Sequence, residues 1–134
     1  MSTGDSAAAD ETAPQGDTGV RLALRLEGLA LFALGVAGYF LAGGDALLLV
    51  PLLLVPDLSM LGYLAGTRWG SVAYNCAHVF VVPAAIVAVG AGLGIALLLP
   101  LGPIWAAHIG IDRCLGYGLK YRDAPFRETL VQRV

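Results

Sequence analysis

Long apolar segments alternate with short polar or glycine-rich breaks along this chain. Four apolar segments can be delimited: Leu22–Ala42, Ala46–Ala65, Val72–Leu99 and Ile104–Leu119. A helix needs about 20 residues to cross the hydrocarbon core of a bilayer, so each segment is long enough or nearly so. Backbone polar groups in lipid must be satisfied within the structure, which favours helices over strands. The pattern predicts an all-α integral membrane bundle of four transmembrane helices.

The two ends of the chain differ in composition from the apolar region. Residues 1–19 are small, polar and acidic and contain no Lys or Arg, so we expect a disordered acidic N-terminal tail. Residues 20–121 form the expected transmembrane domain, and residues 122–134 form a short cytoplasmic tail. Hydrophobic residues make up 57% of the chain and charged residues only 13%, which excludes an ordinary soluble domain.

The basic residues predict the orientation of the bundle. With four spans, both termini and the loop at 66–71 share one side of the membrane. All eight basic residues lie on or toward that side: Arg21, Arg25, Arg68, Arg113, Lys120, Arg122, Arg127 and Arg133. The positive-inside rule makes this side cytoplasmic. We therefore expect a multi-pass cell-membrane protein with cytoplasmic N- and C-termini, in contact with membrane lipid and without nucleic-acid partners.

Small residues recur at helical spacing in two of the segments. Gly28, Gly35 and Gly38 lie in the first segment, and Gly90 and Gly94 lie in the third. Small residues let helix backbones approach closely in lipid. The pattern predicts close packing within one bundle, with a homodimer through these faces as the alternative.

Two prolines and an aspartate interrupt the second segment. Pro51 and Pro56 each remove a backbone donor, and the residue that precedes a proline disfavours the helical conformation. We therefore expect the second helix to be broken at Pro56. This break lies about 15 Å into the span, near the midplane. Asp57 follows it directly. Asp57 either caps the second half-helix through the amide of Ser59 or Met60, or marks a binding site at a discontinuous helix.

The third and fourth segments also carry polar side chains. His108 and Asp112 are four residues apart and share a helix face, and so do Asn75 and His78, three apart. If the third segment is one long helix, His78 and His108 lie about 12 Å apart along the bundle normal. That distance is too great for one metal ion, unless the broken second helix and the long third helix shift the register.

The charges within the spans do not balance. Glu27, Asp57 and Asp112 are acidic, whereas Arg113 is the basic residue among them. Glu27 either reaches the cytoplasmic interface or pairs with Arg113 or His78. Buried charges are normally paired or neutralised. The excess therefore indicates one of three things: a divalent cation, protonated carboxylates that imply proton coupling, or protonated histidines in a structural ion-pair network.

Several stretches resemble a known family. LEGLALFALG, LLVPDLSMLGYLAG, YNCAHVFVVP and WAAHIGIDRCLGYGLKY, read in order, resemble the small integral membrane family named domain of unknown function 4260, over about residues 22–121. The most specific matches are Pro56–Tyr63 and Gly116–Tyr121. The resemblance implies a compact bundle of four spans with polar residues in those motifs, and no established activity. The chain is also similar to membrane-bound metal-dependent hydrolases, since these are small membrane proteins with a Pro-Asp pair and buried histidines.

We therefore expect an intramembrane polar site that faces the cytoplasmic leaflet. It is formed by Asp57, Asn75, His78, His108 and Asp112. In the enzyme hypothesis Asp57, His108 and Asp112 hold a divalent metal, and His78 is the general base, with Asp57 as the second catalytic candidate, in hydrolysis of a lipid-like substrate. The alternatives are a non-catalytic structural or accessory membrane protein with an ion-pair network, and a small proton-coupled transporter.

Aromatic and basic residues are expected around this site. Other intramembrane polar candidates are Glu27, Asn75 and Arg113, and the residues expected at the interface and the mouth are Tyr63, Tyr117, Lys120 and Tyr121. Tyrosine rings favour the membrane–water interface because one end is apolar and the other polar.

Overall fold

Helices account for the secondary structure in the described part of the chain. The computed structural model describes residues 18–119, and it contains no strand in that range. The elements are α1 (Thr18–Leu41), α2 (Leu49–Leu53), the 3₁₀ helix η1 (Val55–Ala65), α3 (Thr67–Ala77), α4 (Val81–Leu93) and α5 (Leu98–Leu115). The all-α prediction is confirmed. The expected terminal tails lie largely outside the described residues.

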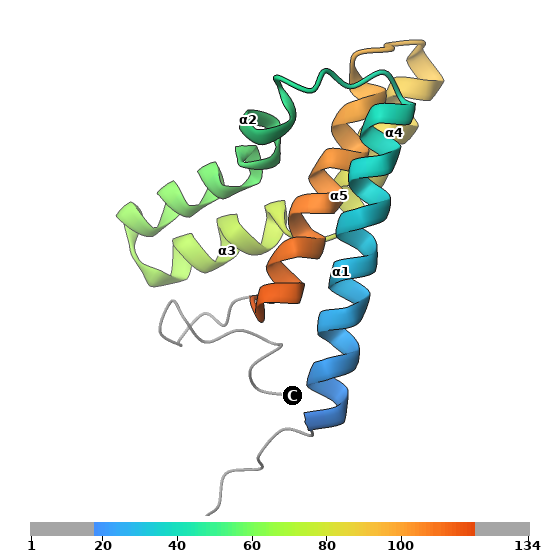
Figure 1. Ribbon diagram of the computed structural model, residues 1–134. Helices are drawn as coiled ribbons and strands as arrows, with labels where there is room; N and C mark the ends of the chain where they lie inside the picture. The colour runs from blue at the N-terminus through green and yellow to red at the C-terminus, as the bar shows by residue number, and fades with distance from the viewer. Residues whose placement is uncertain (1–17, 120–134) are drawn as a thin grey trace, which may run out of the picture.

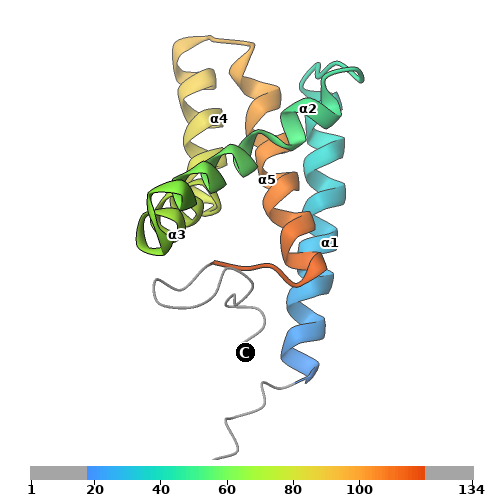
Figure 2. The ribbon, with the colours of Figure 1, turned by 90° about the vertical axis from the view of Figure 1, so that its left-hand side faces the viewer.

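The long helices α1 and α5 run antiparallel, side by side, and form the central pair (Figures 1 and 2). Their backbones touch at glycines. A Cβ built on Gly28 would lie 2.6 Å from the Gly110 carbonyl oxygen, and one on Gly35 would lie 2.6 Å from the Pro103 carbonyl oxygen. Only the absence of a side chain permits this approach. The expected packing within one chain is therefore confirmed for Gly28 and Gly35, whereas it is wrong for Gly94, where an added Cβ would meet no atom within 4 Å.

The second apolar segment is broken where the sequence predicted. Helix α2 ends at Leu53 and η1 begins at Val55, with Pro56 in its first turn, where a missing backbone donor costs little. Leu52 and Leu53 of α2 pack against the core cluster of Tyr39, Ile104 and Ala107 between α1 and α5. This packing fixes the start of η1 against the central pair.

The third segment is two helices, so the expectation of one continuous helix over Val72–Leu99 is wrong. Helix α3 ends at Ala77, His78 caps it, and α4 begins at Val81 with an axis bent by 46°. Pro83 explains the break, because a proline cannot donate to the preceding turn and its ring clashes with that turn. It is tolerated in the first turn of a new helix. The indole N–H of Trp105 donates to the Ala77 carbonyl at 2.7 Å and holds the bend.

The last connection also differs from the prediction. We expected a loop at 100–103, but α5 begins at Leu98, which places Pro100 in its first turn and Pro103 inside the helix. The connection instead begins at Gly94, whose φ of +68° ends α4 in a left-handed cap. Helix α5 thus starts six residues before the expected Ile104 and runs to Leu115.

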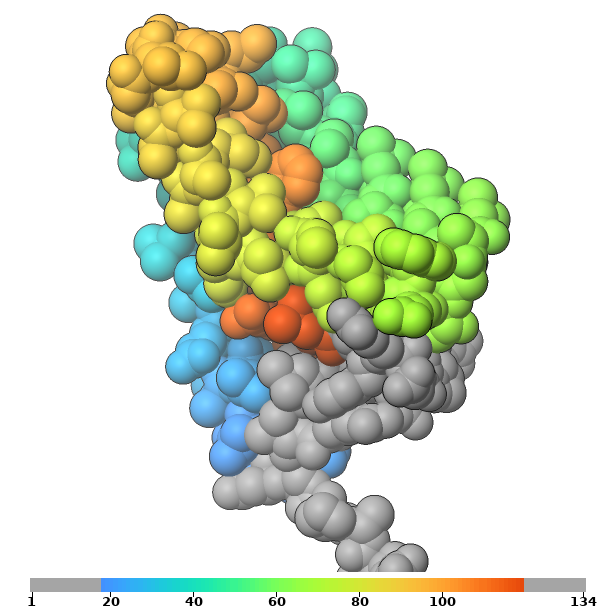
Figure 3. All heavy atoms as spheres, turned by 180° about the vertical axis from the view of Figure 1, so that it is seen from behind, coloured from blue at the N-terminus to red at the C-terminus, as the bar shows by residue number. Residues whose placement is uncertain are grey.

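The hairpin of η1 and α3 projects to one side of the central pair, and α4 packs along α5 (Figures 1 and 2). From behind, part of α5 is visible between α4 and this hairpin (Figure 3). Taken singly, no described helix is both long and apolar enough to span a membrane, while α3 and α4 together meet that requirement by length and composition.

Candidate functional site

Four side chains from three parts of the fold converge on one point. Asp57 comes from η1, His78 from the end of α3, and His108 and Asp112 from α5; one atom of each lies within 4.8 Å of all the others. The two histidine Nε2 atoms are 3.0 Å apart. The expected separation of about 12 Å is therefore wrong. The reason is the bend after α3, which places His78 at a helix end that points at α5.

Three of the separations among the four groups equal those around a small metal ion, whereas the two histidine Nε2 atoms lie closer, at 3.0 Å, and His78 Nε2 and Asp57 Oδ1 lie farther apart, at 3.9 Å. His108 Nε2 lies 3.3 Å from Asp57 Oδ1 and 3.4 Å from Asp112 Oδ2. His78 Nε2 lies 3.4 Å from Asp112 Oδ2 and 3.9 Å from Asp57 Oδ1. With metal–ligand bonds of about 2.0–2.2 Å, tetrahedral ligand atoms lie about 3.3–3.6 Å apart. The donor set and its spacing fit a divalent cation.

The histidine rings are held by backbone groups on their far side. His78 Nδ1 donates to the Tyr74 carbonyl at 2.7 Å, and His108 hydrogen-bonds to the backbone of Leu53. Neutral His78 therefore turns the lone pair of Nε2 toward the cluster. Such backbone partners fix the tautomer and orientation of metal-binding histidines. A metal ion or a shared proton would neutralise the two carboxylates that meet the lone pair here.

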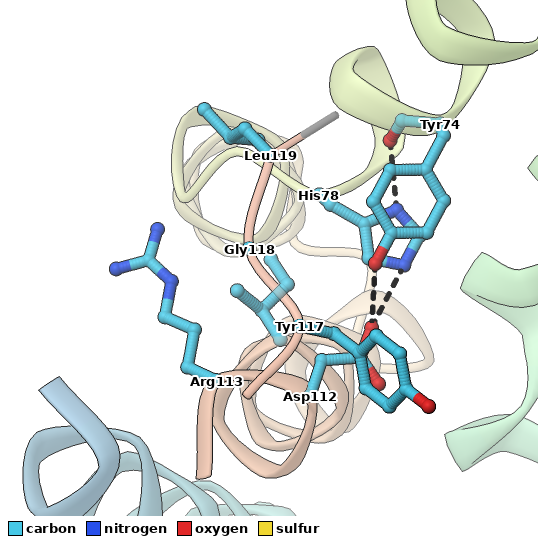
Figure 4. A pocket seen from close by; sticks show the side chains of 8 residues that line it. Tyr74, His78, Asp112, Arg113, Tyr117, Gly118 and Leu119 are labelled. Atoms are coloured by element: carbon cyan, nitrogen blue, oxygen red, sulfur yellow. Dashed lines mark hydrogen bonds and ion pairs between the residues drawn. The ribbon is translucent and has the colours of Figure 1, made fainter. Parts of the chain in front are cut away.

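Tyr74 belongs to the site and was missed by the sequence reasoning. Its hydroxyl donates to Asp112 Oδ2 at 2.9 Å, and its ring stacks on the His78 ring with centroids 3.6 Å apart (Figure 4). It holds a carboxylate and an imidazole of the cluster at once. The available signal was its spacing, because Tyr74 precedes His78 by four residues on α3.

We expect Tyr74→Phe to lower metal affinity by about 10–100-fold, the usual loss for an outer-shell partner. The reason is that Asp112 loses the donor that orients its Oδ2. Isothermal titration with Zn²⁺ measures the change. Tyr39→Phe is the matched control, because it also removes a hydroxyl that donates at 2.7 Å, but to the Asp45 carbonyl in a distant loop. Equal affinity in both variants would contradict the role given to Tyr74.

Asp57 occupies a different environment from the other three groups. Its side chain is 41% exposed, whereas the side chains of His78 and His108 are each 3% exposed. The capping alternative is wrong, because the N-cap of η1 is Leu54 and the Asp57 carboxylate faces His108. The cluster therefore has a closed side and one solvent-accessible carboxylate on a separate element.

The remaining polar candidates lie around the cluster. Asn75 is half-buried. Its backbone carbonyl accepts a hydrogen bond from the backbone N–H of His78 at 3.2 Å, so it supports the cap of α3. Glu27 is exposed on α1 and interacts electrostatically with Arg113. The Arg113 guanidinium lies 4.6 Å above the Phe80 ring.

The aromatic candidates fall in two places. The Tyr63 ring lies against Gly70 in the η1–α3 hairpin. Tyr117 is 40% exposed and, together with Tyr74, His78 and Asp112, lines a small pocket of about 10 Å³ beside the cluster, room for about one water molecule (Figure 4). Lys120 and Tyr121 lie outside the described residues.

Fold and cluster together define the class: an all-helical protein, in the part of the chain that the structure describes, with two buried histidines and two partly exposed aspartates that could hold a metal ion. A family model described as "Domain of unknown function (DUF4260)" matches residues 21–134. The chain belongs to this family, as the resemblance over about residues 22–121 predicted. Neither the curated proteins nor the solved structures provide a match.

Proposed function

We propose that this protein is an integral membrane protein that binds one divalent metal ion through Asp57, His78, His108 and Asp112. The convergence of these four donors within 4.8 Å carries the proposal. Mixed imidazole and carboxylate donors in near-tetrahedral spacing suit Zn²⁺ best and also suit Fe²⁺. The backbone partners of both histidines support it, since a metal-binding imidazole needs its second nitrogen anchored.

A membrane setting is supported by the apolar surface. Leu41, Leu47, Leu64 and Leu97 expose 89%, 87%, 88% and 77% of their surface, and none is covered by the chain itself. Exposed apolar surface on this scale is typical of contact with lipid or a partner. The basic residues favour cytoplasmic termini in the cell membrane. In that orientation the site opens toward the cytoplasmic leaflet.

The reaction class that fits such a site is metal-dependent hydrolysis of an ester bond in a lipid-like substrate. A divalent ion lowers the pKa of bound water to about 7 and so supplies a nucleophile at neutral pH. The sequence hypothesis gave His78 the role of base, but its Nε2 lies 3.0 Å from His108 Nε2 and 3.4 Å from Asp112 Oδ2, among the other donors. We assign His78, His108 and Asp112 to ion binding, and exposed Asp57 to proton transfer from the water and to coordination when substrate is absent.

We expect purified full-length protein in mild detergent to bind one Co²⁺ or Zn²⁺ per chain, with the visible absorption of tetrahedral Co²⁺. Asp112→Ala removes a ligand and should abolish stoichiometric binding. Asp45→Ala is the control, because Asp45 is an exposed carboxylate in the α1–α2 connection. Absence of stoichiometric metal from the gently purified chain, with no Co²⁺ spectrum on titration, would overturn the proposal.

A further inference from the structure

An apolar groove runs between α4 and α5, close to the cluster but separate from it. Its volume is about 590 Å³, within the range of ligand-binding clefts. The α4 side is formed by Phe80, Ala84 and Ala88, and the α5 side by Gly102 and Ala106. Small residues on both helices create the hollow. Every side chain that lines it is apolar, so the groove suits a hydrocarbon chain.

One end of the groove lies beside Arg113, whose guanidinium also interacts electrostatically with Glu27. Phe80 lines the groove two residues after His78, and the Arg113 guanidinium lies 4.6 Å from the Phe80 ring centroid. Arg113 also follows Asp112 directly. Figure 4 shows the Arg113 side chain pointing away from Tyr74 and Asp112. The guanidinium therefore lies between the groove and the pocket beside the cluster, which Arg113 also lines.

We propose that the α4–α5 groove binds the acyl chain of an anionic lipid, whose headgroup lies at Arg113 beside the metal site. An apolar channel that ends in a guanidinium matches a molecule with a hydrocarbon tail and a phosphate head. The headgroup position next to His78 and Asp112 places the ester linkages of this lipid near the cluster. The idea that this lipid is the substrate rests on the proposed function, whereas the idea that the groove binds it does not.

The experiment uses full-length protein in lipid nanodiscs and phosphatidic acid with a photoactivatable diazirine in one acyl chain. Ala88→Trp fills the groove, and Ala85→Trp is the matched control, an exposed alanine on α4 that does not line it. We expect cross-links on α4 and α5, reduced about fivefold or more by Ala88→Trp because the indole occupies the apolar space. Ala85→Trp should label like the wild type. If Ala88→Trp does not fold, Ala84→Phe replaces it.

The headgroup is tested by comparison with a diacylglycerol that carries the same photoactivatable chain. We expect wild-type protein to prefer phosphatidic acid by about tenfold, as a charge-assisted contact gives, and Arg113→Gln to lose this preference. Arg68→Gln, at an exposed arginine on α3, should keep it. Equal labelling of the two tryptophan variants, or no preference for phosphatidic acid in the wild type, overturns the inference.

His108→Ala separates this inference from the proposed function. The groove contains neither His108 nor its ligand partners. Retained labelling in a variant that binds no metal supports the lipid site by itself. Loss of labelling in His108→Ala, with the helical content preserved, would contradict a lipid site independent of the cluster.

Discussion

Gly110→Ala is expected to destabilise the protein strongly, because the added methyl group meets the backbone of the neighbouring helix. A Cβ at this position would lie 2.6 Å from the Phe32 amide nitrogen and 2.7 Å from the Gly28 carbonyl oxygen. Both atoms are backbone of α1, so no side-chain rotation relieves the contact. The α1–α5 pair must separate, and we expect a loss of more than about 3 kcal/mol, the upper range for overpacking. Thermal unfolding followed by circular dichroism measures it.

Gly92→Ala is the matched control for Gly110→Ala. Gly92 also lies inside a helix, but a Cβ there meets no atom within 4 Å. Alanine should stabilise α4 by about 0.5–1 kcal/mol, because glycine is the poorer helix former. If Gly110→Ala unfolds at nearly the same temperature as Gly92→Ala, the α1–α5 crossing tolerates a methyl group and the central pair is not held by backbone contact.

The fold could be predicted from sequence where one local signal acted alone. The break at Pro56 follows a run of apolar residues without competing signals, and it was predicted correctly. Pro83 was overlooked and Pro100 was taken as part of a loop, because proline has two opposite uses: it ends a helix, and it fits the first turn of the next. Which use applies depends on tertiary packing, such as the hydrogen bond from Trp105 to the Ala77 carbonyl that holds the bend.

The site was predictable in its residue types but not in its geometry. Asp57, His78, His108 and Asp112 were singled out because charged groups are rare in apolar segments. Their convergence depended on the bend that the sequence reasoning missed, since His78 reaches α5 only from the end of α3. Tyr74 was missed because a tyrosine in an apolar helix is ordinary, and its contact with Asp112 joins residues 38 apart.

Three separate elements supply the cluster, and this arrangement has a thermodynamic consequence. Helix α5 provides His108 and Asp112, while η1 and α3 each provide one group from the hairpin. An ion bound at this point therefore links the hairpin to the central pair. Because the four donors come together only in the folded chain, metal binding must stabilise the fold.

We expect chelation to lower the unfolding temperature and stoichiometric Zn²⁺ to restore it. At a free concentration of about 100 times the dissociation constant, one bound ion adds about 2.7 kcal/mol, a shift on the order of 10 °C for a chain of this size. His108→Ala should unfold at one temperature with and without Zn²⁺, because its loss removes a direct ligand. Differential scanning of the full-length protein in detergent gives these values.

The same measurement separates a metal site from a structural ion-pair network. In a structural ion-pair network, a proton between His78 and His108 takes the place of the metal ion, so a chelator does not change the unfolding temperature. Removal of His108 then leaves His78 as the one imidazole of the cluster beside Asp57 and Asp112, and breaking a buried pair in this way costs about 3–5 kcal/mol. A wild-type protein indifferent to chelator, with a severely destabilised His108→Ala, would therefore exclude the metal. A zinc-dependent shift in the wild type that disappears in His108→Ala would exclude the network, because a proton gives no dependence on zinc concentration.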